Sequence, residues 1–435
     1  MPAPDVAALL AELERSEPDV AESARLAVEW LAGGEALETI SQLDVCEFLW
    51  HTLPVKVRGD RHAIARALGE LLRLGGMNRY AALCDSAATE RILRVYAREG
   101  EEAGSAAYHQ ALEATGVLPP DIPELSWSSI MGPEEMGAHV ACAAALELAI
   151  VAGDPVDREE LTRRWLTAER PELGGDCWLH RVQGERLNRW VLGRGSARRE
   201  LAQPFEVRLH APIPAPDGPC LEPLRWLLDL ARTGIRLTER LNLATAVVQE
   251  GAGRFAWPPP RGRVVRVEAD LPPLTALREL AVELRAVRRS GRRLVLTPTG
   301  RAMLDDPRRL WEAATSALLA PAQGERDLDV SIREIAMMML VDGGEVAEAE
   351  LRDRVAEVVN GEGWRSAGGG RVTPDDLARP MAELRRRLDA LHLRRTDGLA
   401  SPSGAPWLLT AAGRSAALAA LRAQALRPRQ YAGLG

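Results

Sequence analysis

The chain has 435 residues, of which 46% are hydrophobic and 27% charged, and its formal net charge is −7. Such a composition is that of a globular protein with real cores, and this length predicts two to four domains. No run of about 18 apolar residues is present, and the chain begins with an acidic segment where a secretory signal would be basic and then apolar. We therefore expect a cytoplasmic protein without a membrane span.

Charge is distributed unevenly along the chain. Segments 1–130 and 131–220 carry net charges of −10 and −3, whereas 221–313 carries +6 and 326–430 carries +1. Lys56 is the only lysine, and such a bias toward arginine is typical of a GC-rich genome, so abundant arginine by itself says little about function. A basic segment attracts phosphate by counterion release, and an acidic domain beside it would weaken that attraction.

The first half of the chain has apolar residues at helical spacing, which predicts a helical bundle. We expect a helical domain over 1–117, a proline-rich linker over 118–132 and a helical middle domain over 133–210. A second linker, 211–220, contains APIPAPDGP, with four prolines in nine residues, and predicts the clearest domain boundary.

An internal repeat follows this second linker. Leu280 and Leu284 in the first copy match Leu384 and Leu388 in spacing, and LTPTGR (296–301) matches LTAAGR (409–414). On this alignment the second copy is nine residues longer between the helix and the Leu-Thr element, in the loop TDGLASPSGAP. Each copy reads as helix, glycine turn, helix, longer helix, short β segment and helix, which is the order of a winged helix. We therefore expect a mainly α protein with two tandem winged-helix-like modules, over 221–320 and 326–430.

Several segments resemble a known group of proteins. These are DVCEFLWHTLPVKV (44–57), LGGMNRYAALCDSAATERILRVY (74–96), LTERLNLATAVVQE (237–250) and the segment 271–311. They are similar to the helical and tandem C-terminal regions of actinobacterial plasmid Orf-3-like proteins, also described as transposon-passenger proteins. The resemblance implies a winged-helix C-terminal half, and it implies no catalytic residues and no substrate.

The arginines of the first module are the main candidate site. A helix is expected from about Leu274 to Arg288, with an arginine stripe beside its apolar face, and a basic wing is expected to follow it. In a winged helix this helix enters the major groove and the wing meets the backbone or the minor groove. The candidate DNA-binding residues are Arg278, Arg285, Arg288, Arg289, Arg292, Arg293 and Arg301, with Arg385, Arg386, Arg387, Arg394 and Arg395 as candidates in the second module, where 385–387 are expected to fan around the exposed side. The alternative is a solvated arginine-rich face or a protein-docking surface.

Two further sets of residues are candidates for a metal site and for a ligand pocket. His139-x-x-Cys142 and Cys177-x-x-His180 together offer two histidines and two cysteines, a possible tetrahedral zinc set. Because cysteine in an alanine-rich helix is usually a small buried residue, and five scattered cysteines form no CxxC pair, we expect neither a metal or other cofactor nor a disulfide. A ligand pocket formed by tryptophans is a weaker alternative to a core role for Trp127, Trp165, Trp178 and Trp190.

The sequence thus favours a non-enzymatic protein that binds duplex DNA through 221–313, with regulation as a role open to it. The first alternative is an interaction or scaffold protein whose winged helices dock a protein partner or form a homodimer. The second alternative is a small-ligand sensor or an enzyme that uses the tryptophan-rich middle segment.

Overall fold

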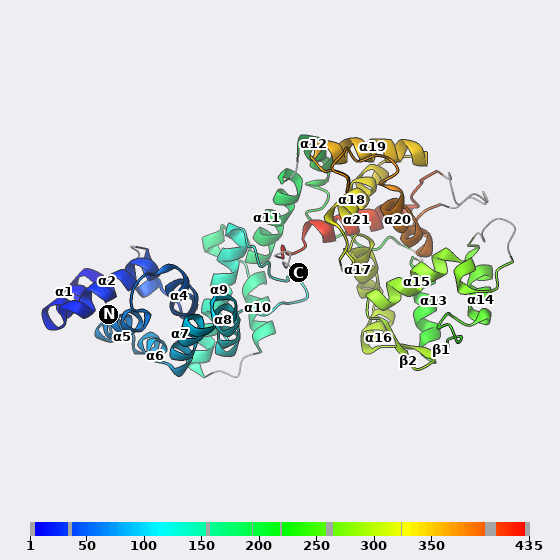
Figure 1. The fold of residues 1–435 in the computed structure, drawn as a ribbon. Coiled ribbons are helices and arrows are strands. Elements are labelled where there is room, and N and C mark those ends of the chain that lie inside the picture. Colours follow the sequence, from blue (N-terminus) through cyan, green and yellow to red (C-terminus); the bar gives the residue numbers. More distant parts are fainter. Residues whose placement is uncertain are drawn as a thin grey trace. The chain divides into compact units, whose positions relative to one another are not determined.

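The structure is a computed structural model that describes residues 5–33, 37–153, 157–193, 195–217, 220–257, 264–322, 324–395 and 406–430 (Figure 1). The chain is mainly α-helical, as the sequence predicts. It forms two compact units, the first comprising Met1–Val182 with Pro428–Gly435 and the second comprising Gln183–Arg427.

The first unit is built from helices with side-chain caps that the sequence supplies. Ser41 and Asp44 form a reciprocal capping box, and Asp60 and Ser86 each accept backbone N–H groups at the start of the helix that follows them. The helices are α1 (Val6–Ser16), α2 (Pro18–Ala32), α3 (Gln42–Glu47), the π-helix η2 (Phe48–Thr52), α4 (Leu53–Lys56), α5 (Arg61–Leu74), α6 (Asn78–Cys84), α7 (Ala87–Glu99), α8 (Glu101–Thr115), α9 (Pro133–Ala152), α10 (Arg158–Thr167) and the first residues of α11 (Trp178–Leu192).

Helix α9 is the most apolar helix of this unit. Of the described residues, it is the one helix long and apolar enough to cross a membrane by length and composition. Two of its carboxylates, however, are buried and bonded to other parts of the unit. Glu147 accepts the Gln42 N–H at 2.7 Å and the Tyr80 hydroxyl at 2.8 Å, and Glu135 accepts the Ser128 N–H at 2.7 Å. Buried carboxylates need such partners, so these bonds fix one side of α9 to the unit, while Leu148 and Val151 of the same helix are exposed.

The second unit has one continuous hydrophobic core that runs through both copies of the repeat. The first copy comprises α13 (Glu222–Ala231), β1 (Ile235–Arg236), α14 (Thr245–Phe255), α15 (Pro272–Glu283), β2 (Val287–Ser290), β3 (Arg293–Leu296) and α16 (Pro298–Asp305). Helix α17 (Pro307–Leu318) follows, and the second copy comprises α18 (Asp327–Val341), α19 (Glu348–Gly361), α20 (Ala378–Ala390) and α21 (Ala411–Ala425), while α12 (Ser196–Ala202) precedes both.

The strands of the first copy form a small antiparallel sheet in the order β1-β3-β2. The hairpin β2–β3 turns at Gly291, whose φ of 58° suits glycine, and pairs Ser290 with Arg293. In the second copy the corresponding pairings are single bridges, between Val346 and Trp407 and between Arg394 and Leu409. The loop insertion predicted at TDGLASPSGAP lies almost wholly outside the described residues.

The repeated Leu-Thr-x-x-Gly-Arg motif has the same physical role in both copies. Thr297 caps α16 by accepting the Gly300 N–H, and its own N–H donates to the Ala286 carbonyl at 3.0 Å. A Cβ on Gly300 would collide with that same carbonyl oxygen, so the close approach requires glycine. Thr410 and Gly413 repeat these contacts against the Leu393 carbonyl.

These bonds correct the predicted alignment of the two copies. Ala286 and Leu393 are equivalent, and the residue before each has a positive φ, 52° at Arg285 and 56° at His392. Leu277 therefore corresponds to Leu384, three residues away from the predicted match of Leu280. The longer segment of the second copy then has six extra residues and not nine, because Thr297 lies 11 positions after Ala286 and Thr410 lies 17 positions after Leu393.

The division of the chain into two units falls within α11, between Val182 and Gln183, whereas the sequence placed the clearest boundary in 211–220. This proline-rich segment is held inside the second unit, where the Trp311 indole N–H donates to the Ile213 carbonyl at 3.0 Å. Proline content predicts the irregular backbone but does not reveal that a tryptophan 98 residues further on fixes it.

Candidate nucleic-acid interface

The arginines of the first copy are placed by a helix that ends earlier than predicted. Helix α15 stops at Glu283, and Arg285 follows it with a left-handed φ of 52°. The predicted helix to Arg288 is therefore wrong at its C-terminal end. Arg288 and Arg289 instead lie on β2, and Arg293 lies on β3.

The one candidate arginine that does lie within α15 is occupied inside the module. The Nε atom of Arg278 lies 2.8 Å from Oε1 of Glu268, and its Nη1 donates to the Leu241 carbonyl at 2.9 Å. Glu268 is 1% exposed and also accepts the Leu243 N–H, while burial raises its pKa. Arg278 thus neutralises a buried carboxylate, and this side chain is not free to read a base.

The sheet gathers the remaining arginines. Arg236 pairs directly with Arg293 across β1 and β3, and Arg288 pairs with Val295 across β2 and β3. Because cross-strand partners share a face and neighbours along a strand alternate, these three arginines lie on the face opposite the buried Leu294. All three are exposed. Nothing in the sequence marks Arg236 as a member of this group, because its position beside Arg293 depends on the pairing of β1 with β3.

This region has a strong excess of positive charge. Segments 232–240 and 285–301 contain nine arginines and a single carboxylate, that of Glu239. Glu239 lies 3.8 Å from Arg292, and both side chains are exposed. Within the described residues Arg236, Arg288 and Arg289 form no ion pair, nor do Arg240, Arg285 and Arg301. An uncompensated cluster of this kind is costly by itself and is stabilised by anions.

The candidate arginines of the second copy are arranged differently. Arg385 pairs with Glu348 and stacks over the Trp407 ring at 4.8 Å, and burial lowers its pKa to about 10. Arg394 is 7% exposed and is held by Asp389 at 2.8 Å. These side chains stabilise the module.

Arg387 is also buried, with 9% of its surface exposed. The expectation that residues 385–387 fan around the exposed side of their helix is therefore wrong. The sequence signal misled because consecutive arginines on a helix necessarily point in different directions. Arg386 is paired with Glu383, and Arg395 is exposed, its N–H bonded to the Leu408 carbonyl.

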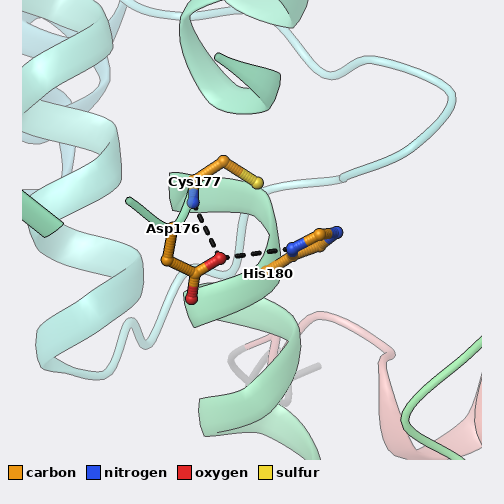
Figure 2. Close-up of side chains that lie close together, drawn as sticks. All are labelled: Asp176, Cys177 and His180. Atoms are coloured by element: carbon orange, nitrogen blue, oxygen red, sulfur yellow. Dashed lines mark hydrogen bonds and ion pairs between the residues drawn. The ribbon is translucent and has the colours of Figure 1, made fainter. Parts of the chain in front are cut away.

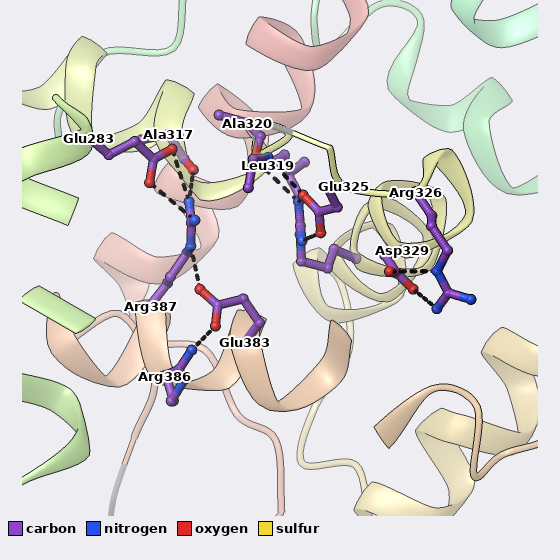
Figure 3. A network of polar contacts seen from close by, with 12 residues as sticks. Glu283, Ala317, Leu319, Ala320, Glu325, Arg326, Asp329, Glu383, Arg386 and Arg387 are labelled. Atoms are coloured by element: carbon purple, nitrogen blue, oxygen red, sulfur yellow. Dashed lines mark hydrogen bonds and ion pairs between the residues drawn. The ribbon is translucent and has the colours of Figure 1, made fainter. Parts of the chain in front are cut away.

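The equivalent helices α15 and α20 pack against each other (Figure 3). Arg387 of α20 lies 3.1 Å from Glu283 of α15 and also bonds to Glu383 and to the Ala317 carbonyl. Arg386 approaches Glu279 of α15 at 4.0 Å. One side of each helix is therefore covered by its counterpart in the other copy.

The candidate metal set is not assembled as a set of four. Among the described residues, the one group of potential ligands is Asp176, Cys177 and His180, with ligand atoms within 4.8 Å of one another (Figure 2). The Asp176 carboxylate accepts the Cys177 N–H at 2.8 Å and lies 3.2 Å from Nδ1 of His180, as expected at the start of a helix. His139 and Cys142 are not part of this group.

The four tryptophans do not form one pocket. Trp127, Trp165 and Trp178 pack on a small core in the first unit that includes Cys142 and Cys177. Trp190 packs on the core of the second unit, and its indole N–H donates to Glu334. All four side chains are partly buried against these hydrophobic cores.

Comparison with known families gives one partial match. A family model described as the Y4jL N-terminal domain matches residues 219–309, which covers the first copy of the repeat from the segment before α13 into α17. Comparison with curated proteins and with solved structures gave no match to this chain.

Proposed function

We propose that the chain is a cytoplasmic, non-enzymatic protein whose first winged-helix module binds the phosphate backbone of duplex DNA. The order α13, β1, α14, α15, β2, β3 with an antiparallel three-stranded sheet is that of a winged helix. The observation that carries the proposal is the exposed sheet, where Arg236 lies opposite Arg293 and nine arginines accompany one carboxylate. The chain's relationship to plasmid Orf-3-like proteins is part of this proposal.

Binding is proposed to occur through the wing and not through the helix that usually reads bases. Helix α15 is covered on one side by its own module and on another by α20, and its Arg278 is paired with Glu268. Phosphate contacts fix a protein on DNA but carry no sequence information directly. We therefore expect weak sequence preference and a strong dependence on salt.

A second candidate function is supported by a different observation. The α15–α20 contact shows that the third helix of each module can serve as a protein-packing surface. A winged helix that uses this helix for packing is suited to a protein partner or to a second copy of the chain. The experiment below separates the two functions, because only DNA binding depends on the sheet arginines.

The test measures binding of the full chain to a labelled mixed-sequence duplex, by fluorescence anisotropy, at several salt concentrations between about 50 and about 200 mM. The variant combines Arg236→Gln, Arg288→Gln and Arg293→Gln. Each lost phosphate contact should reduce the slope of log K against log salt by about 0.9.

The control combines Arg208→Gln, Arg254→Gln and Arg309→Gln, which remove the same charge from side chains already paired with Asp342, Glu222 and Asp306. This control should keep the wild-type slope. Equal losses in both variants would show an effect of net charge alone. No binding by the wild type at about 50 mM salt would remove DNA and leave the protein-partner function.

A further inference from the structure

A hollow in the first unit has basic walls although the surrounding segment is acidic. The hollow has a volume of about 670 Å³ and is formed by the end of α4, the loop to α5 and, across from them, Leu93 and Ala97 of α7. The segment KVRGDRH (56–62) runs from the last residue of α4 through the loop to the start of α5, and it places Lys56, Arg58, Arg61 and His62 along the wall. This occurs within a segment, 1–130, whose net charge is −10.

The cations of this hollow have no carboxylate partner among the described residues. Many other arginines of the unit do, such as Arg73 with Glu70 at 2.8 Å and Arg79 with Glu147 at 3.0 Å. The one acidic residue in the wall is Asp60, and its carboxylate is engaged as the cap of α5, where it accepts two backbone N–H groups at 3.0 and 3.1 Å. The helix terminus is therefore already satisfied, and the positive charge left over belongs to the side chains.

The loop that carries these cations is held in place at both ends. Val57 is 5% exposed and Ile64 is 3% exposed, so the segment that carries Arg58 and Arg61 is anchored in the core at both ends, and Lys56 directly precedes the first anchor. Gly59 has a φ of 123°, which L-residues rarely adopt, and a Cβ added there would meet the Cδ1 atom of Ile64 at 3.4 Å. Anchoring of this kind reduces the ordering cost of binding, which a free basic loop would have to meet in full.

We propose that this hollow binds a phosphate ester through Lys56, Arg58 and Arg61. Phosphate oxygens accept charge-assisted hydrogen bonds from arginine and lysine, and several cations without carboxylate partners along one hollow match a group that carries two negative charges. The volume lies in the range of small-molecule sites and exceeds what a single phosphate group needs. The phosphate comes either from a small phosphorylated molecule or from the backbone of a nucleic acid. The second source rests on the proposed function, whereas the first is independent of it.

The test uses the full chain and has two arms. One arm measures binding of the small phosphates pyrophosphate and ATP, and the other measures binding of the labelled duplex. Isothermal titration calorimetry at low salt measures the first arm. The variant Lys56→Gln/Arg58→Gln should weaken binding of the small phosphates about tenfold or more, because each charge-assisted bond contributes enough for such a change. The sheet variant Arg236→Gln/Arg288→Gln/Arg293→Gln should bind them as the wild type does, which separates this site from the proposed DNA interface.

The matched control is Arg66→Gln/Arg91→Gln, two exposed arginines of the same unit that lie outside the hollow. This control should leave both arms unchanged. If the small phosphates do not bind but the Lys56/Arg58 variant lowers the salt slope of duplex binding, the ligand is the nucleic-acid backbone. The proposal is overturned if the Lys56/Arg58 variant matches its control in both arms, whatever the sheet variant does.

Discussion

Arg236 of β1 lies directly opposite Arg293 of β3 in an antiparallel ladder, with both side chains on the exposed face of the sheet. Like charges in this position destabilise a sheet by about 0.2–1 kcal/mol, so the fold retains an unfavourable pair that only an anion would relieve. We expect Arg236→Thr to raise the free energy of unfolding by a few tenths of a kcal/mol at low salt. The same change should weaken DNA binding.

This first prediction is checked by urea unfolding at about 0.02 M and about 0.5 M salt, since screening should remove most of the gain at the higher concentration. Arg254→Gln is the control, because Arg254 already lies 3.8 Å from Glu222. A stability gain in Arg236→Thr that persists at high salt would point to strand propensity and not to charge.

The glycines of the repeated motif give a second prediction. Gly300→Ala and Gly413→Ala would each place a methyl group against a backbone carbonyl oxygen, that of Ala286 or Leu393. Because the carbonyl belongs to a hydrogen-bonded backbone, it cannot move aside cheaply, and we expect each change to cost about 1–3 kcal/mol of stability. Circular dichroism during urea unfolding measures this loss.

Gly253→Ala is the matched control for the glycine changes. Gly253 lies in α14 and an added Cβ there meets nothing within 4 Å, so the substitution should stabilise the protein by about 0.5–1 kcal/mol. If Gly300→Ala and Gly253→Ala had the same effect, the motif would be a coincidence of sequence and not a shared contact.

How far the sequence predicted this structure differs from feature to feature. The Thr-x-x-Gly spacing marked equivalent positions in both copies because a cap and a close approach are local and need particular residues. The alignment of the preceding helices was wrong by three residues because the left-handed residues at their ends are Arg285 and His392, and no glycine marks either position.

The candidate site was predicted only in part for a similar reason. Arg288, Arg289 and Arg293 were recognised from their density in the sequence, but their grouping with Arg236 depends on a strand pairing between residues nearly 60 positions apart. The burial of Arg387 depends on contacts with Glu283 and Ala317, which lie more than 60 residues away in the chain. Composition reports that arginines are present, and only the tertiary contacts decide which of them are neutralised.

The His139 imidazole gives a third prediction, on pH. Burial lowers its pKa to about 4, and the ring contacts Trp127 edge to face at 5.0 Å. In the unfolded chain the pKa is about 6.5, so between pH 6.5 and 4 the unfolded state binds a proton that the folded state does not. Stability present above pH 6.5 is therefore lost as the pH falls toward 4, by up to about 3 kcal/mol and less where water reaches the ring.

The substitution His139→Gln should flatten the pH dependence of unfolding over this window. Urea unfolding at several pH values measures the dependence, and the ring proton shifts of His139 in NMR spectra report its titration directly. A midpoint near 6.5 for His139 in the folded protein would contradict the prediction, whatever the stability data show.

The contact between α15 and α20 gives the last prediction, which compares the substitution of two neighbouring residues of α20. Arg387 is 9% exposed and satisfies Glu283, Glu383 and the Ala317 carbonyl, whereas the side chain of Arg386 is 40% exposed. Arg387→Gln leaves the buried Ala317 carbonyl without its donor and leaves Glu283, whose side chain is 33% exposed, without its cation, and we expect it to cost about 1–3 kcal/mol. Arg386→Gln removes the same charge from the same helix and should cost less than about 1 kcal/mol.

Urea unfolding of both variants measures the difference, and hydrogen exchange locates it. The amides of α15 and α20 should lose protection together in Arg387→Gln, because the two helices share one core, while those of α5 and α7 in the first unit should not change. Adding Glu283→Gln to the Arg387→Gln variant should recover part of the lost stability, because the carboxylate without a cation is then removed. Equal costs for Arg386→Gln and Arg387→Gln would show that α20 is held to α15 by its apolar side chains alone, and the helix would then be easier to release for a DNA groove or for a protein partner.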